Sequence, residues 1–272
     1  MRYVRPKKAL GQHFLCDLSI ARRIADTVDA CPVLPILEVG PGTGVLTQFL
    51  LEKGRPLRVV EIDNESVSYL LQHFPQLADE DIIPDDFLKM HLERTFGEPF
   101  VLTGNYPYNI SSQIFLRVAE YRDLIPCCTG MVQKEVAERL AAQPGTKAFG
   151  ILSALVQMWY DVEYLFTVEP EVFNPPPKVR SAVIRLIRNA RTEAGCDERL
   201  YRRLVKTVFN QRRKMLRVTL RGLLAQLDNE RGCTTDYSAM LAEPLFTRRP
   251  EQLSVDDFIA LTQRISRKDY SI

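Results

Sequence analysis

The chain has 272 residues, of which 46% are hydrophobic and 26% charged, and its formal net charge is +2. This composition excludes a disordered chain, and the lack of any apolar stretch near the ~18 residues of a membrane helix predicts a soluble globular protein with no membrane partner. The basic N-terminus runs into Gly11-Gln12-His13 instead of an apolar segment, so we expect no secretory signal and a cytoplasmic location. Six cysteines without a C-x-x-C pair and only three histidines indicate no metal and no disulfide framework, and we expect buried free thiols.

Short apolar runs alternate with amphipathic segments from residue 35 to residue 187, the pattern of βα units on a parallel sheet. We expect strands at residues 36–39, 57–62, 82–83, 100–103, 129–132, 162–166 and 182–187. Between them we expect helices at residues 46–53, 64–73, 112–121, 134–142 and 149–159. Seven strands with this alternation predict a doubly wound sheet.

The last two strands are separated by Pro170 and by the run Pro175-Pro176-Pro177, which cannot donate to a ladder. We therefore expect them to pair as an antiparallel hairpin at the edge of the sheet. After Asn189 the pattern becomes helical, with helices expected at residues 198–210, 212–227 and 255–266, the last preceded by a capping box of Ser254 and Asp257. The predicted fold is α/β: a mostly parallel seven-stranded domain over residues 1–190 and a small all-helical domain over residues 191–272.

The basic residues are unevenly distributed. Residues 178–222 hold 14 Lys and Arg against three acidic residues, a local net charge of about +11, which leaves the rest of the chain at about −9. Such a segment can neutralise phosphates and suggests a nucleic-acid partner. A solvated helix face explains the composition equally well.

A glycine-rich loop, Glu38-Val39-Gly40-Pro41-Gly42-Thr43-Gly44, follows the first of the seven strands. Closely spaced glycines permit positive φ and let a ligand approach the backbone. The spacing departs from the dinucleotide motif G-x-G-x-x-G, because Val45 stands where that motif has its third glycine. Glu61 lies at the end of the next strand, where a carboxylate can accept hydrogen bonds from ribose hydroxyls, as in NAD enzymes and in methyltransferases that use S-adenosylmethionine. Asp86 follows the third strand, as an acceptor for an adenine amine or as a turn aspartate.

The fourth strand is followed by Asn105-Tyr106-Pro107-Tyr108. The exocyclic amine of adenine is a poor nucleophile, so an enzyme that alkylates it needs hydrogen-bond acceptors on the amine and an aromatic face for the base. The Asn105 side-chain oxygen and a backbone carbonyl of the loop can accept, Tyr108 can stack, and Pro107 holds the turn. An ordinary strand-to-helix turn is the alternative.

Five segments follow one another along the chain: residues 7–15 (KKALGQHFL), 38–44 (EVGPGTG), 105–110 (NYPYNI), 133–136 (QKEV) and 172–183 (VFNPPPKVRSAV). In this order they resemble the ribosomal RNA adenine dimethyltransferase family over nearly the whole length. Two positions depart from the family's usual residues, His13 for Asn and Tyr106 for Leu. We expect these departures to alter affinity and not to abolish the chemistry.

The resemblance implies a Rossmann-like class I methyltransferase fold and dimethylation at N6 of two adjacent adenines near the 3′ end of small-subunit (16S) rRNA, within the assembling small ribosomal subunit. The sequence does not reveal self-association, and we take a monomer as the default expectation. It implies that S-adenosylmethionine is bound by Gln12, His13, Leu15, Gly40, Gly42, Glu61, Ile62, Asp86, Phe87 and Asn105. It further implies that Tyr108 stacks on the flipped adenine and that Phe173 closes the other face. Phosphate contacts are expected from Arg5, Lys7, Lys8, Lys178, Arg202, Arg203, Lys206, Arg212, Arg213 and Lys214.

Three other functions stay open. A relative that methylates large-subunit rRNA would share the glycine loop and the Asn-x-Pro-Tyr type of site, although the segment 173–183 and the helical tail favour the small subunit. A non-enzymatic RNA-binding assembly factor would not need Glu61, Asp86, Asn105 and Tyr108 intact. A nicotinamide oxidoreductase is disfavoured by the glycine spacing.

Overall fold

The structure is a computed structural model that describes residues 4, 6–7 and 10–266. The chain divides into two compact units by its internal contacts. Unit 1 comprises Met1–Ala141 and Tyr160–Asn189, and unit 2 comprises Ala142–Trp159 and Ala190–Ile272. Residues 142–159 therefore group with the C-terminal helices by packing, and the division into two separately folding domains at residue 190 stays a prediction.

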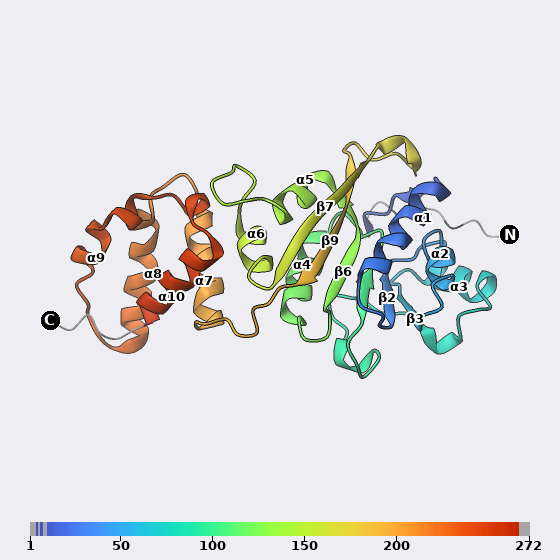
Figure 1. Ribbon diagram of the computed structural model, residues 1–272, viewed down its shortest axis with the longest axis horizontal. Coiled ribbons are helices and arrows are strands. Elements are labelled where there is room, and N and C mark those ends of the chain that lie inside the picture. The colour runs from blue at the N-terminus through green and yellow to red at the C-terminus, as the bar shows by residue number, and fades with distance from the viewer. Residues whose placement is uncertain (1–3, 5, 8–9, 267–272) are drawn as a thin grey trace. The chain divides into compact units, whose positions relative to one another are not determined.

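Unit 1 is built on a seven-stranded sheet in the order β4-β3-β2-β5-β6-β9-β7 (Figure 1). Five strands pair in parallel: β2 (Ile36–Val39), β3 (Leu57–Val60), β4 (Ile82–Ile83), β5 (Val101–Thr103) and β6 (Cys127–Gln133). Their residues are almost all buried, since helices cover a parallel sheet on both faces. The predicted mostly parallel α/β fold is confirmed.

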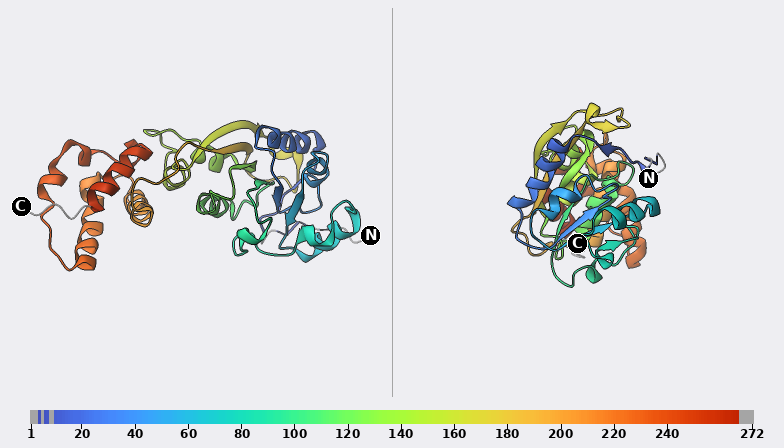
Figure 2. Two further views of the ribbon diagram at one scale, coloured as in Figure 1. Left: turned by 60° about the horizontal axis from the view of Figure 1, so that its bottom comes forward. Right: turned by 90° about the vertical axis from the view of Figure 1, so that its right-hand side faces the viewer.

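The predicted edge hairpin is also confirmed. β9 (Ser181–Arg188) lies antiparallel between β6 and the edge strand β7 (Tyr160–Val168). The register of β7 on β9 shifts between Tyr164 and Phe166. A bulge of this kind increases strand twist, and the curvature of the yellow-green hairpin is visible in Figure 2.

The helices of unit 1 are α1 (Leu18–Asp26), α2 (Thr47–Leu51), α3 (Asn64–His73), α4 (Ser111–Glu120) and α5 (Lys134–Leu140). α1 was not predicted, although its N-terminal signal is local: the Asp17 carboxylate accepts the backbone N–H groups of Ser19 and Ile20. Two short strands were also missed. β1 (Phe14–Leu15) pairs antiparallel with β8 (Phe173–Asn174) and brings the N-terminal segment onto the proline-rich loop.

Unit 2 contains α6 (Ile151–Val156), α7 (Glu198–Asn210), α8 (Leu216–Arg231), α9 (Ser238–Ala242) and α10 (Val255–Ser266). Its core is aromatic: the rings of Phe149 and Phe258 lie 6.2 Å and 5.8 Å from that of Phe209. The capping box of α10 is confirmed, because the Ser254 N–H donates to Asp257 and the Asp257 N–H to the Ser254 hydroxyl. The predicted start of α8 at residue 212 is wrong, since residues 211–214 form a turn first.

Short 3₁₀ turns connect these elements, at Thr27–Ala30, Asp79–Asp81, Leu92–Arg94, Pro170–Val172, Pro244–Thr247 and Pro250–Gln252. Within the part of the chain that the structure describes, no helix is long and apolar enough to cross a membrane. Among the same residues, no group of three or more His, Cys, Asp or Glu side chains is arranged to hold a metal ion.

The expectation of buried free thiols is wrong for four of the six cysteines. Cys31 and Cys127, whose Cα atoms lie 5.7 Å apart, form a disulfide, and Cys16 and Cys233 are exposed. Cys128 is the buried free thiol. The disulfide joins residues 96 positions apart, and their proximity depends on the packing of α1 and its following turn against β6, which spacing does not show.

Candidate active site

A cavity in unit 1 opens at the carboxyl ends of the parallel strands, where ligands bind in open α/β sheets. Four segments line it: the N-terminal residues 10–15, the glycine loop, the ends of β3 and β4, and the loop after β5. They bring together nearly all the predicted cofactor and catalytic residues, namely Gln12, His13, Leu15, Gly40, Gly42, Glu61, Ile62, Asp86, Phe87, Asn105, Pro107 and Tyr108. Phe14, Glu38 and Asn109 also line the cavity, and they were not predicted as site residues.

The glycine loop leaves its backbone open to the cavity. Gly40 has φ +67° and Gly42 has φ +57°, a region that residues with a Cβ rarely adopt. A Cβ on Gly42 would lie 3.0 Å from the Phe14 ring. Glycine at position 42 is therefore required both by the turn and by the close approach of the N-terminal segment.

Glu61 is buried, with an exposed fraction of 3%, and holds the loop in place. One carboxylate oxygen accepts the Gly42 N–H at 3.0 Å and the other accepts the Asp63 N–H at 2.9 Å. Burial raises the pKa of Glu61, and these backbone donors act against that rise. Each carboxylate oxygen has a further lone pair, so Glu61 can still accept hydrogen bonds from a ligand.

Glu38 is a second buried carboxyl, beneath the glycine loop. It accepts a hydrogen bond from the Thr47 hydroxyl at 2.7 Å. Burial, with a smaller contribution from the negative charge of Glu61, raises the pKa of Glu38 to about 8. At neutral pH the folded protein therefore keeps a proton on Glu38. The sequence held a signal for Glu38 as a site residue, namely its place at the start of the glycine loop, but we assigned Glu38 only to the end of a strand.

Asp86 has the turn role that the sequence left open, and its role as an acceptor for adenine stays a prediction. Its carboxylate accepts the Leu88 N–H at 2.9 Å and pairs with Lys89 at 3.3 Å, as a turn aspartate does. It also lines the cavity, together with Ile62, whose side chain is half exposed. An acceptor and an apolar side chain thus line the same cavity as Glu61.

The geometry of the Asn105 side chain is fixed by the N-terminal segment. Its Nδ2 donates to the His13 carbonyl at 3.2 Å. Because a carbonyl only accepts, the amide nitrogen must face His13, and Oδ1 is left as an acceptor. Backbone contacts of the flanking residues with Met131 hold Asn105 against β6.

Tyr106, which departs from the family's usual leucine, is a fully buried anchor of the same loop. Its hydroxyl donates to the Thr129 carbonyl at 2.8 Å and lies 3.2 Å from Cys128 Sγ. A Cβ on Gly130 would lie 2.7 Å from the Tyr106 ring, so glycine there makes room for it. The Tyr106 side chain therefore anchors the loop to β6, a structural role that the sequence did not indicate.

Tyr108 lines the cavity, and its hydroxyl contacts Ser181 Oγ. The His13 ring lies 5.1 Å from that of Tyr108 at an angle of 33°, and His13 Nδ1 is 2.8 Å from the Pro175 carbonyl. Since that carbonyl only accepts, Nδ1 carries the proton. His13 therefore bridges the loop after β5 and the proline-rich loop.

The predicted stacking role of Phe173 does not fit the structure. Phe173 is paired with Leu15 in the small β1–β8 sheet and is 4% exposed, within the hydrophobic core. It is absent from the cavity lining. A buried core side chain has no free face for a base, and we no longer assign it that role.

The predicted phosphate contacts lie in both units. Arg5 and Lys8 fall outside the described residues, and Lys7 pairs with Asp63 at 2.5 Å. Lys178 is exposed in the proline-rich loop. In unit 2, α7 carries Arg202, Arg203 and Lys206, and the turn before α8 carries Arg212, Arg213 and Lys214. Arg203 is held by Glu230 at 2.8 Å, whereas Lys206, Arg213 and Lys214 are exposed.

Comparison with known proteins gives a consistent result over both units. The sequence profile of a family described as ribosomal RNA adenine dimethylase matches residues 4–233. A ribosomal RNA small subunit methyltransferase A of Phocaeicola vulgatus is 64% identical over 97% of this chain and 91% of its own length. The enzyme of that name from Flavobacterium johnsoniae is 50% identical over 97% of each chain.

Two solved structures with 26% sequence identity each cover 92% of this chain. A dimethyladenosine transferase from Plasmodium falciparum superposes with a TM-score of 0.74 over 96% of its length. The 23S rRNA methyltransferase ErmE superposes with a TM-score of 0.63 over 99% of its length.

Proposed function

Because the chain belongs to the ribosomal RNA adenine dimethylase family, we propose that it dimethylates N6 of two adjacent adenines near the 3′ end of small-subunit (16S) rRNA, with S-adenosylmethionine as methyl donor, late in small-subunit assembly. The observation that carries the proposal is the single cavity in which the glycine loop and Glu61 meet the Asn105–Tyr108 loop. The relatives at 64% and 50% identity are named for the small subunit, and the large-subunit enzyme is 26% identical.

The lining of the cavity fits S-adenosylmethionine in its chemistry. Glu61 offers acceptor sites for ribose hydroxyls, and Ile62 and Asp86 offer an apolar face and an acceptor for adenine. Glycines at positions 40 and 42 leave room for a ligand against the backbone. When bound, S-adenosylmethionine supplies an electrophilic methyl group on a sulfonium.

The residues of the catalytic loop would orient and polarise the target amine. Asn105 Oδ1 and the backbone carbonyl of Tyr106 or Pro107 accept the two amine hydrogens, and the Tyr108 ring stacks on the base. Such acceptors favour a pyramidal nitrogen with a localised lone pair. No strong base is required, because methylation makes the nitrogen cationic and its proton then leaves readily. Catalysis on this account is by positioning.

Among the predicted phosphate contacts in unit 2, the exposed Lys206, Arg213 and Lys214 are proposed to contact RNA phosphates, with recognition of RNA shape dominating over base reading. Lys178 would do the same in unit 1, which holds the cavity. We further propose that the protein acts as a monomer, in the cytoplasm, on a subunit still in assembly.

Methyl transfer from labelled S-adenosylmethionine to isolated small subunits lacking this modification tests the proposal, with large subunits as control. Dimethyladenosine in small-subunit RNA alone is expected on nucleoside analysis. Label confined to large-subunit RNA would move the assignment to the relatives that modify 23S rRNA. Tight subunit binding without label would favour an assembly factor.

A further inference from the structure

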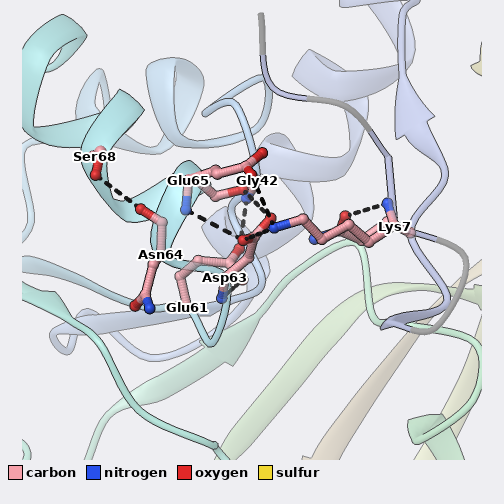
Figure 3. A network of polar contacts seen from close by, with 9 residues as sticks. Lys7, Gly42, Glu61, Asp63, Asn64, Glu65 and Ser68 are labelled. Carbon is pink, nitrogen blue, oxygen red and sulfur yellow. Dashed lines mark hydrogen bonds and ion pairs between the residues drawn. The ribbon is translucent and has the colours of Figure 1, made fainter. Parts of the chain in front are cut away.

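Lys7 has a different environment from the one expected of a phosphate contact. Its ammonium lies 2.5 Å from Asp63 Oδ1 and 3.5 Å from Glu65 Oε1 (Figure 3). The Asp63 side chain is 2% exposed, whereas that of Glu65 is exposed. An RNA phosphate approaching Lys7 would meet these two carboxylates, and like charges repel. The hydrogen bond that the Lys7 ammonium donates to Asp63 raises the pKa of Lys7, so the ammonium stays charged.

Asp63 connects Lys7 with the glycine loop. The Asp63 N–H donates to Glu61 Oε1 at 2.9 Å, and Glu61 Oε2 accepts the Gly42 N–H at 3.0 Å. Asp63 is also the N-cap of α3, because its carboxylate accepts the Glu65 N–H. Figure 3 shows the Lys7 side chain reaching across to this network. The ammonium thus contacts the residue that helps to orient the proposed ribose carboxylate.

The N-terminal segment is attached to unit 1 at both of its ends. At one end, the Lys7 ammonium binds Asp63. The Lys7 backbone also holds the segment together, because the Lys7 N–H donates to Gln12 Oε1 at 2.8 Å and the Lys7 carbonyl accepts the Leu10 N–H at 3.0 Å. At the other end, His13 accepts from Asn105 and contacts Pro175. Residues 10–15, which line the cavity, lie between or next to these attachments.

We propose that Lys7 is a positioning residue of the cofactor site: its ion pair with Asp63 holds the N-terminal segment over the cavity and so strengthens binding of S-adenosylmethionine, a role that rests on the proposed function. Lys7 itself does not line the cavity. Its effect is therefore on the affinity for the methyl donor and not on turnover or on RNA binding.

The test compares full-length variants by calorimetric titration with S-adenosylmethionine and by steady-state methyl transfer to small subunits. Lys7→Met keeps the apolar stem and removes the charge, Lys7→Arg keeps the charge, and Asp63→Asn removes the partner charge while leaving a good N-cap for α3. Lys53→Met is the matched control, since Lys53, like Lys7, bridges two carboxylates, here Asp26 and Asp29, each at 2.7 Å, and does not line the cavity.

Lys7→Met and Asp63→Asn are each expected to raise Kd and KM for S-adenosylmethionine about three- to fivefold, the range of a partly exposed ion pair. The double variant should add nothing further. Lys7→Arg should stay within about twofold of wild type, as should Lys53→Met. The kcat and the KM for subunits should not change.

Three results would overturn the role of Lys7. An unchanged Kd for S-adenosylmethionine with a raised KM for subunits would make Lys7 the phosphate contact that the sequence suggested. No change in either constant would make the ion pair incidental, and an equal loss in Lys53→Met would indicate general destabilisation. Failure of the wild-type protein to bind S-adenosylmethionine would instead refute the proposed function.

Discussion

Replacing Glu38 by glutamine should change the pH dependence of stability in a defined direction. Burial raises the pKa of Glu38 from 4.5 to about 8 in the folded protein. Between these two values the folded state holds a proton that the unfolded state has released, so stability falls as pH rises through this window and levels off above it. Glutamine can still accept from Thr47 at this position and does not titrate.

The size of the effect follows from the two pKa values. One pKa unit corresponds to about 1.4 kcal/mol, and integration from pH 5 to pH 7 gives a loss of about 2.5 kcal/mol in the wild type that Glu38→Gln should not show. The other titrating groups are common to both proteins, so the difference between the two pH profiles isolates Glu38.

Urea unfolding followed by circular dichroism at pH 5, 6 and 7 measures this difference. Carbon-13 NMR of glutamate-labelled protein should in addition show one carboxyl that titrates near pH 8 in the wild type and is missing from Glu38→Gln. Parallel stability profiles for the two proteins, or no glutamate that titrates above pH 6, would mean that Glu38 is ionised in the fold and that the reasoning from burial is wrong.

Three further substitutions test the site. Asn105→Ala should lower kcat by orders of magnitude, because an acceptor on the target amine acts in the transition state. The Kd of S-adenosylmethionine, measured by calorimetry, should stay within about threefold of the wild-type value. Equal losses in kcat and in affinity would make Asn105 structural. Glu61→Gln should raise the Kd of S-adenosylmethionine about 10- to 100-fold. The glutamine amide cannot accept from both the Gly42 and the Asp63 N–H groups, and it loses the charge-assisted hydrogen bonds of the carboxylate. An unchanged Kd would refute the ribose assignment. Tyr106→Phe should lower the free energy of unfolding by about 1–3 kcal/mol in urea, because the Thr129 carbonyl loses a buried donor, and a wild-type value would show that the hydroxyl contributes nothing.

The parts of the fold that local patterns determine were predictable. β2, β4, α3, α7 and α10 have the predicted bounds, since the strands are apolar runs and the helices carry N-terminal caps in their own sequence. The cavity lining was predictable for a related reason: the carboxyl ends of parallel strands share one edge of the sheet, so residues that follow successive strands converge there.

Features that depend on distant packing were not predictable. Phe173 lies within the proline-rich loop in the sequence, but its pairing with Leu15, 158 positions away, makes it a core residue. In the sequence, Lys7 belongs to a basic N-terminal segment, and only the fold brings Asp63, 56 positions away, into contact with it. Glu38 keeps its proton because it is completely buried. The sequence shows that a glutamate precedes the glycines, but it does not show that the fold buries this carboxyl.

The central claim is tested most directly by the methylation state of small-subunit RNA in a bacterium whose own dimethyltransferase has been deleted and replaced by this chain. Mass spectrometry of the 3′-terminal RNA fragment should show two adjacent N6-dimethyladenines, and the same strain carrying Asn105→Ala should show unmodified adenines. Unmodified small-subunit RNA in the strain with the wild-type chain, expressed and bound to subunits, would contradict the account.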